Sequence, residues 1–436
     1  MTRATGTGPF RLLMYGLVLA SAAAQFALVP VVPVYAHRLG LSGFQQGLVL
    51  GATGLASLAV SVPAGTLSDR FGARRITLAA GLLMAAATFG QALAGSFPAL
   101  LAARLAFGAG YGVVWTAGLC WLAASAAGPR ALGGSVASAG VGGVAGPAVS
   151  GALTQHFGLA VPLLATGAGF ALITGGLAAL RTPPGPVTPR GPARPASLRA
   201  AVRDRGVIGA AAAVITAGLS TGACALLVPA QLHLAGASSG QIGLAFAAAG
   251  ILFAAGSALT TAAGRRAVTL PVTCAGMLAL TAALALGVFS TASVILIVML
   301  CAATAARSVL WTVSYPLAAE AAGRRGIGLG TAVGLLNGIW AATAVLGPLG
   351  AGLAAQHLGS RAAFGLTEAV CVAALAVTVA AAGRFPVRAH VLAWRPARLA
   401  ARVPAGLDSR APARLAAGGG PGADPVAGRA SGTAVP

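Results

Sequence analysis

The chain has 436 residues, of which 57% are hydrophobic and only 8% are charged. Soluble proteins carry about 25% charged residues because their surfaces face water, so this composition excludes a soluble enzyme, a secreted disulfide scaffold and a disordered chain. The 28 basic residues, all Arg, outnumber the 6 acidic ones and give a net charge of +22. Since these arginines stand almost entirely between apolar runs, we expect a membrane protein with no nucleic-acid partner.

Twelve apolar segments follow one another along the chain, each long enough for a membrane-spanning helix of about 20 residues. The Pro/Arg-rich residues 181–206 predict a cytoplasmic linker between two six-helix bundles, 1–180 and 207–382. Residues 383–436 are predicted to be a disordered basic cytoplasmic tail. In chain order, the predicted spans are 10–35, 44–66, 76–94, 98–122, 133–154, 160–180, 207–231, 240–262, 269–289, 293–318, 327–353 and 362–382.

The distribution of arginine predicts the orientation of these spans. Loops on the cytoplasmic side of a membrane carry the excess of positive charge. If both termini face the cytoplasm, that side holds 24 arginines, and the opposite side holds two, Arg38 and Arg361. We therefore expect a multi-pass protein of the cytoplasmic membrane with both termini in the cytoplasm.

The two halves of the chain repeat each other. Trp115 corresponds to Trp311 at an offset of 196 residues, and GLSGFQQG at 40–47 corresponds to GASSGQIG at 236–243. Further along, GPAVSGALTQHFG at 146–158 matches GPLGAGLAAQHLG at 347–359 at an offset of 201. Two homologous bundles related by an axis along the membrane normal are one architecture of secondary transporters. The predicted fold class is thus an all-α integral membrane fold of two pseudo-symmetric six-helix bundles.

Three motifs resemble signatures of one transporter family. The loop after the second span reads GTLSDRFGARR at 65–75 and is similar to the signature G-x-L-a-D-r-x-G-r-r of the major facilitator superfamily. RLAFGAG at 104–110 resembles the R-x-x-x-G-x-G element of its proton antiporters. GGVAGPAVSG at 142–151 resembles the antiporter signature G-x-x-x-G-P-x-x-G-G, with Ser150 as the departure. The resemblance covers all twelve spans and implies the twelve-helix drug:proton antiporter group.

In the family, the first of these motifs latches the two halves in the outward-open state. The alternative is a plain positive loop on the cytoplasmic side. Ala73 replaces a basic residue of the signature, and the fourth span ends without an acid, so we expect Glu320 to pair with Arg265 or Arg266 instead. The resulting gating set comprises Gly65, Asp69, Arg70, Gly72, Arg74, Arg75, Arg265, Arg266 and Glu320.

The antiporter signature on the fifth span places small residues at close helical spacing. Small residues let two helices approach closely, and proline kinks a helix. Gly142, Gly146, Pro147 and Gly151 therefore predict a bend and a tight seal against the other half. The alternative is ordinary glycine packing in a chain with 63 glycines.

Polar and aromatic residues on two paired spans predict a substrate cavity. An ionisable residue at the centre of a span costs about 2.5–3.5 kcal/mol and is a candidate for function. Arg104 and Arg307 each begin a helical stripe of aromatic residues, as expected of a cavity wall between the halves; the alternative is aromatic packing in the core or at the membrane interface. The predicted cavity set is Gln25, Arg104, Tyr111, Trp115, Arg307, Trp311, Tyr315 and Asn337.

Proton coupling has one candidate residue. Most proton antiporters of the resembled family use a carboxylate in the cavity, often on the first span, where this chain has Gln25 and no acid. Glu368 is the only carboxylate within a span and is either the proton carrier or a structural partner of Arg361. Two buried cations against one acid also fit an anionic or zwitterionic substrate that meets Arg307 or Arg104.

These observations predict a secondary transporter that exports a drug or secondary metabolite in exchange for protons by alternating access. The alternatives are a facilitator or symporter for an organic anion or metabolite, and a non-transporting receptor on the same fold. We expect no enzyme, because no metal-ligand cluster or nucleophile–base set is present, and we expect no cofactor and no metal. The expected partners of a monomeric chain are the small organic substrate, protons and the lipid bilayer.

Overall fold

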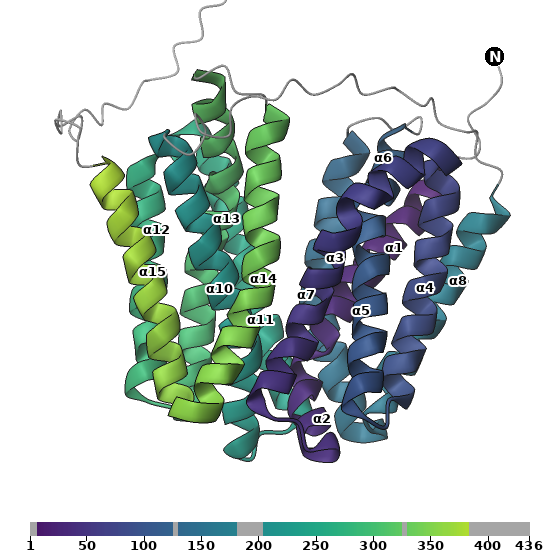
Figure 1. The fold of residues 1–436 in the computed structure, drawn as a ribbon, viewed down its shortest axis with the longest axis horizontal. Coiled ribbons are helices and arrows are strands. Elements are labelled where there is room, and N and C mark those ends of the chain that lie inside the picture. The colour runs from purple at the N-terminus through teal and green to yellow at the C-terminus, as the bar shows by residue number, and fades with distance from the viewer. Residues whose placement is uncertain (1–6, 125–129, 181–203, 325–328, 383–436) are drawn as a thin grey trace, which may run out of the picture. The chain divides into compact units, whose positions relative to one another are not determined.

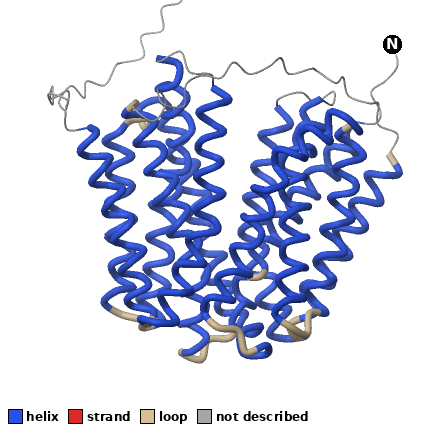
Figure 2. The backbone as a smooth tube through the Cα atoms, in the orientation of Figure 1, coloured by secondary structure: helices blue, strands red, loops and turns tan. Residues whose placement is uncertain are grey.

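The computed structural model describes residues 7–124, 130–180, 204–324 and 329–382. These residues form helices joined by short turns (Figure 2). The predicted tail, and the predicted linker up to residue 203, lie outside the described residues. Twelve helical stretches of the described chain are long and apolar enough to cross a membrane, which confirms the predicted all-α membrane fold.

Helices α1 to α8 form the first half, and helices α10 to α15 form the second (Figure 1). The elements of the first half are α1 Thr7–Ala27, η1 Val29–Val31, α2 Val32–Leu39, α3 Gly43–Phe71, α4 Ala73–Leu93, α5 Phe97–Val113, η2 Val114–Gly118, α6 Leu119–Ala124, α7 Arg130–Phe157 and α8 Ala160–Ala179. Those of the second half are α10 Arg205–Leu234, α11 Ser239–Ala263, η3 Gly264–Arg266, α12 Leu270–Phe289, α13 Ser293–Arg324, α14 Leu329–Leu358 and α15 Ser360–Ala382.

The sequence repeat reappears in how helices begin. Ser42 caps α3 by accepting a hydrogen bond from the backbone N–H of Gln45, whose side chain accepts one from the N–H of Ser42. Ser238 and Gln241 make the same two bonds at the start of α11. Such reciprocal bonds satisfy N–H groups that the first turn of a helix leaves unpaired. The repeated residues therefore fix the same helix start in both halves.

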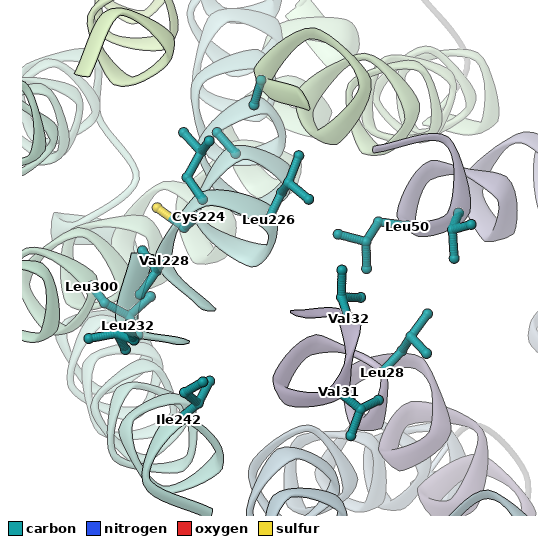
Figure 3. Packing of buried hydrophobic residues seen from close by; sticks show 14 of the residues in the cluster. Leu28, Val31, Val32, Leu50, Cys224, Leu226, Val228, Leu232, Ile242 and Leu300 are labelled. Carbon is teal, nitrogen blue, oxygen red and sulfur yellow. The ribbon is translucent and has the colours of Figure 1, made fainter. Parts of the chain in front are cut away.

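The hydrophobic core distinguishes one end of the molecule from the other. One cluster of buried side chains draws on both halves, including Leu28 and Val32 from the first and Leu226 and Leu232 from the second (Figure 3). The other clusters of the described chain each stay within one half, such as the cluster around Phe107. The two halves therefore share a core only at the end where α2 meets α3 and α10 meets α11.

The first helical span is broken, whereas its counterpart is continuous. Pro30 has no N–H to continue the helix, and the N–H of Val31 turns to the carbonyl of Leu28 at 3.1 Å, so that α1 ends at Ala27 and the short η1 follows. At the repeat offset of 196, Leu226 stands in place of Pro30, and α10 runs through this position unbroken. The break is therefore particular to the first half.

Candidate functional site

At one end of the molecule, here called the closed end, glycines bring the two halves into backbone contact. A Cβ atom built on Gly47 of α3 would lie 2.3 Å from the carbonyl oxygen of Pro348 on α14. A Cβ built on Gly243 of α11 would lie 2.3 Å from the carbonyl oxygen of Pro147 on α7. Real Cβ atoms do not approach this closely, so both crossings require glycine. The two crossings are related by the sequence repeat, and Figure 1 shows α3 beside α14 and α7 beside α11.

Two glutamines add polar contacts between the halves at the closed end. The side-chain oxygen of Gln356 on α14 accepts a hydrogen bond of 3.2 Å from the backbone N–H of Phe44. Its repeat equivalent on α7, Gln155, accepts one of 3.0 Å from the hydroxyl of Ser238. Each amide thus reaches the first turn of a helix in the other half.

The opposite end, here called the arginine-rich end, carries Arg70, Arg74, Arg75, Arg265 and Arg266. Gly334 and Gly338 of α14 have nothing within 4 Å of a Cβ position there, unlike the glycines of the closed end. Since no described core cluster joins the halves at this end either, their contact is one-sided.

The loop motif has partners within its own half in this structure. The Arg74 guanidinium donates hydrogen bonds of 2.8 and 3.2 Å to the carbonyl oxygens of Ala178 and Leu180, at the end of α8. A cation at the end of a helix satisfies carbonyls that lack partners there. Gly72 joins α3 to α4 with a φ of 87°, which favours glycine. Asp69 belongs to α3, but its side chain lies outside the described part of the structure.

The second half places the predicted ion pair at the same end. The guanidinium of Arg265 on η3 lies 3.9 Å from the carboxylate of Glu320 near the end of α13. The two side chains are 94% and 40% exposed, so the pair is a weak surface contact. Arg266 is exposed beside it, and of the two pairings the sequence allowed, the structure has the one with Arg265.

The glycines of the antiporter signature on α7 contact two different helices. Cβ atoms built on Gly142 and Gly146 would each lie 2.3 Å from backbone oxygens of α1, those of Leu19 and Ala23. A Cβ on Gly151 would lie 2.3 Å from the carbonyl oxygen of Ser239 on α11. The motif therefore packs α7 against α1 within the first half and, one turn further along, against the second half.

Arg104 is the most deeply buried charge of the first half. It is 1% exposed, and its Nη2 atom donates to the side-chain oxygen of Gln25 at 2.9 Å and to the backbone oxygen of Gln25 at 3.2 Å. Its guanidinium carbon lies 5.0 Å from the centre of the Phe107 ring, a cation–π distance. Arg104 therefore binds the last turn of α1, just before the break at Pro30.

Ser150, the residue that departs from the antiporter signature, also binds this break. Its hydroxyl donates a hydrogen bond of 2.7 Å to the carbonyl oxygen of Ala27. That carbonyl has lost its helical donor, since the N–H of Val31 bonds to Leu28. A buried carbonyl without a partner costs about 1–3 kcal/mol. Ser150 avoids this cost by donating to the Ala27 carbonyl, which a glycine at this position of the signature could not do.

Tyr111 and Trp115 continue from Arg104 along the fourth span. Their ring centres are 5.8 Å apart, and both side chains are partly buried. Trp115 lies in η2, a π-helical turn that interrupts the α-helix, and such turns occur often at functional sites. The indole nitrogen of Trp115 is buried and has no hydrogen-bond partner among the described residues.

The second half gathers a larger aromatic group, here called the aromatic wall. The rings of Trp311 and Tyr315 on α13 are 5.6 Å apart, and those of Trp311 and Trp340 of α14 are 4.6 Å apart. The hydroxyl of Tyr315 donates to the side-chain oxygen of Asn337 at 2.7 Å. The wall consists of Trp311, Tyr315, Asn337 and Trp340.

Arg307 precedes the aromatic wall by one turn of α13. Its Nη2 atom donates to the hydroxyl of Thr304 at 2.8 Å, and its Nη1 atom is buried without a hydrogen-bond partner in the described chain. No carboxylate of the described residues forms an ion pair with it. Arg104 also has one buried atom without a described partner, Nε, but it meets two acceptors on α1 where Arg307 meets one hydroxyl.

Glu368 lies on α15, which packs against α10, α12 and α14. It is partly buried and shares a helical face with Phe364 and Cys371, both fully buried. Within the described chain it forms no ion pair with Arg361, the structural partner considered from the sequence. Its side chain thus lies on the protein side of an outer helix of the second half.

Sequence reasoning did not single out Trp340, Gln155 or Gln356. The glutamines are recognisable afterwards, because they stand at equivalent places of the repeat, 201 residues apart. Trp340 has no aromatic counterpart at that offset, since position 139 is Ala. Only the packing of α14 against α13 brings it to Trp311.

Twelve helices in two related halves that meet at one end form a membrane fold of the kind found in secondary transporters. The sequence profile of the Major Facilitator Superfamily matches residues 14–333, and the chain belongs to this family.

Curated relatives match only part of the chain. An uncharacterised MFS-type transporter, YuxJ of Bacillus subtilis, is 34% identical over 149 residues, which span 32% of this chain and 38% of that protein. The quinolone resistance protein NorA of Staphylococcus aureus is 33% identical over 87 residues, 20% of this chain and 22% of NorA. The chain therefore spans well under half the length of these relatives.

Solved structures share the fold over most of the chain. A bacterial homologue of the human lysosomal transporter Spinster, in an inward-facing and occupied conformation, has a TM-score of 0.72 at 17% identity, covering 86% of this chain and 96% of that one. The nucleoside transporter NupG has a TM-score of 0.70 at 12% identity, covering 86% and 100%. At these identities the likeness is one of fold.

Proposed function

We propose that the protein exports a small organic compound, a drug or secondary metabolite, in exchange for protons by alternating access. The observation that carries the proposal is the one-sided contact between the halves. The glycine crossings at Gly47 and Gly243 hold them together at the closed end, while Gly334 and Gly338 meet nothing at the other. A substrate site between such halves is accessible from one side at a time.

The membrane orientation expected from the arginines indicates on which side of the membrane the substrate site is open. With the arginine-rich end in the cytoplasm of a cell and the protein in the cytoplasmic membrane, the site is open inward, where an exporter loads its substrate. The Arg265–Glu320 contact and the loop motif around Asp69 then lie at the cytoplasmic gate, which closes when the transporter turns outward. The partial similarity to NorA, a quinolone resistance protein, supports export as the direction.

The proposed cavity is lined by the aromatic stripes of the two halves. Tyr111 and Trp115 belong to the first half, and the aromatic wall belongs to the second. Gln25 and Arg104 close the cavity on the first-half side through their mutual hydrogen bonds. Glu368 is the proposed proton carrier, since it is an ionisable residue within a span and holds no ion pair among the described residues.

Accumulation assays test this function in an efflux-deficient host. A cationic dye and a panel of acidic antibiotics are measured with and without the protein, and with a protonophore added. Lower accumulation that the protonophore abolishes is the expected result, and Glu368→Gln is then expected to abolish the coupling. Unchanged accumulation across the panel would contradict export.

The organic-anion facilitator remains a second candidate because Arg307 has no acidic partner in the described chain. Uptake of an anion that is insensitive to the protonophore would favour it over the exporter. A receptor on the same fold would bind a ligand without moving it, and its signalling would tolerate replacement of Asp69, whereas either transporter should stop.

A further inference from the structure

We propose that Arg307 and the aromatic wall bind the anionic head group and the aromatic ring of an aromatic carboxylate. This assignment rests on the proposed function, because it names the substrate class of the same cavity. It commits the cavity to a charge and a shape and names the residues that recognise each.

The first step is the uncompensated charge of Arg307. A buried guanidinium needs an anion or several acceptors to offset the loss of water around it. Arg307 has the hydroxyl of Thr304 as its acceptor, and its Nη1 atom is buried with none in the described chain. The side chain of Cys224 on α10 is buried and supplies no carboxylate. An anion supplied from outside the chain completes this site.

The second step is the shape of the missing anion. The guanidinium is planar and presents its N–H groups as a fork, which a carboxylate accepts with both oxygens. Nη1 carries two of these N–H groups, and both are unused among the described residues. Neighbouring protein atoms enclose Nη1 in this structure, so a carboxylate satisfies these donors once the side chains around them move aside.

The third step is the aromatic wall beside this charge. Trp311 follows Arg307 by four residues, so both lie on one face of α13. Side chains on a helix lean toward its N-terminus, so the indole of Trp311 lies on the Arg307 side of its own backbone position. Trp340 packs on the other side of Trp311 at 4.6 Å and widens the apolar surface. A ring attached directly to the carboxylate lies on this surface, where aromatic pairs gain about 0.5–1.5 kcal/mol beyond burial.

The fourth step is access from the arginine-rich end. Along α13 toward that end, Arg307 is followed by Trp311, Tyr315 and finally Glu320. Asn337 is exposed at the level of Tyr315, and the glycines of α14 nearby have nothing packed on them. Arginines around this entrance attract anions over neutral or cationic compounds. A ligand that enters from the arginine-rich end therefore passes the aromatic wall before it reaches the guanidinium of Arg307.

Binding of two matched probes tests the assignment. 2-Naphthoate and the neutral 2-naphthamide share the same ring and differ in charge. Their affinities for the purified full chain in detergent are measured by calorimetry, with protein-free micelles as the blank. We expect naphthoate to bind at least about tenfold more tightly than naphthamide, the lower range for a hydrogen bond to a charged group.

Variants locate the preference on Arg307. Arg307→Gln should reduce the ratio of the two affinities to about one, while Arg307→Lys, which keeps the charge without the fork, should keep part of it. Arg361→Gln is the matched control, because it removes the same charge from an exposed position at the closed end. The control should keep the full ratio.

The outcomes separate this site from the proposed function. Failure of wild-type protein to prefer naphthoate, or a preference that survives in Arg307→Gln, would overturn the anion site. Protonophore-sensitive dye export by such a protein would leave the export function intact. The protein could also show a naphthoate preference that depends on Arg307 and yet export nothing in the accumulation assay. That result would support the anion site and contradict the proposed export.

Discussion

The two halves of this transporter repeat each other in sequence, yet the arginine within a span of each half is held differently: Arg104 is buried, and Arg307 is partly buried. In the first half, Arg104 donates twice to Gln25 and lies against the Phe107 ring. In the second half, Arg307 meets the Thr304 hydroxyl and has a buried nitrogen without a partner in the described chain. Each arginine has one buried atom without a described partner, but Arg104 is bound by two acceptors of α1 and Arg307 by one hydroxyl.

The broken first span accounts for the partners of Arg104. Pro30 interrupts the first span and frees carbonyl groups, and Arg104 and Ser150 both donate to the turn around the break. The second half has Leu226 at the corresponding position, and α10 continues through it as a helix despite Pro229 three residues further on. The halves therefore differ at Pro30, and the polar residues that donate to the turn around it, Arg104 and Ser150, belong to the first half.

The largest expected effect concerns the glycine crossings of the closed end, which are the same in both halves. Gly47→Leu and Gly243→Leu each place a side chain on a carbonyl oxygen of the other half, at 2.3 Å from the Cβ position. Overpacking of this kind costs about 3 kcal/mol, so the closed end should open. Spin labels at Arg38 and Arg361 are expected to report longer distances in both variants.

A matched control for these variants is Gly175→Leu on α8, where a Cβ atom meets nothing within 4 Å. This variant should leave the label distances unchanged. Opening by one of the two glycine variants alone would mean that one crossing holds the closed end, against the symmetric contact described above.

The next effect concerns Arg104 and its acceptor. Arg104→Gln should lower the free energy of unfolding in micelles by about 2 kcal/mol, because the bonds of a charged donor are lost and buried acceptors are left unpaired. Combining it with Gln25→Leu in a double-mutant cycle should give a coupling of about 1 kcal/mol. Strict additivity of the two variants would show that the pair contributes nothing.

A smaller effect is expected from the serine at the break. Ser150→Ala removes the hydroxyl that donates to the Ala27 carbonyl and should lower the free energy of unfolding by about 1 kcal/mol. Ala351 stands at the repeat position, 201 residues on, beside a continuous helix. Ala351→Ser should therefore bring no stabilisation, and a gain as large as the loss at Ser150 would contradict the role given to the break.

The smallest effect belongs to the surface ion pair of the second half. Arg265→Glu or Glu320→Arg should shift the balance between inward- and outward-open states by less than about 1 kcal/mol, with the effect fading at high salt. The charge-reversed double variant should restore wild-type transport, and Arg266→Glu should change little, since the contact is to Arg265. Failure of the double variant to restore transport would remove the pair from the proposed gate.

Much of the fold could be predicted from the sequence, because the signals involved are local. Spans of about 20 apolar residues and a repeat at a nearly constant offset sufficed for twelve helices in two related halves. The Arg265–Glu320 contact was one of two pairings expected, since both arginines lie in the loop that faces the end of α13. The family signatures were recognisable because they are short and contiguous.

The remaining features depend on how helices rotate against each other. The partners of Arg74 at the end of α8 and of Ser150 at Ala27 come from helices far away in the sequence. The π-helical turn at Trp115 and the approach of Trp340 to Trp311 carry no sequence pattern of their own. Composition and periodicity predict which residues are buried, but the contacts of each buried side chain depend on how the helices pack.

The measurement that tests the different roles of the two arginines most directly is thermal unfolding of Arg104→Gln and Arg307→Gln, each with and without 2-naphthoate. We predict that Arg104→Gln melts below the wild type and is still stabilised by naphthoate. Arg307→Gln should melt at or above the wild type, since it removes a partly buried charge that has no ion pair among the described residues, and it should lose the stabilisation by naphthoate. Equal destabilisation of both variants, with naphthoate still stabilising Arg307→Gln, would contradict the account.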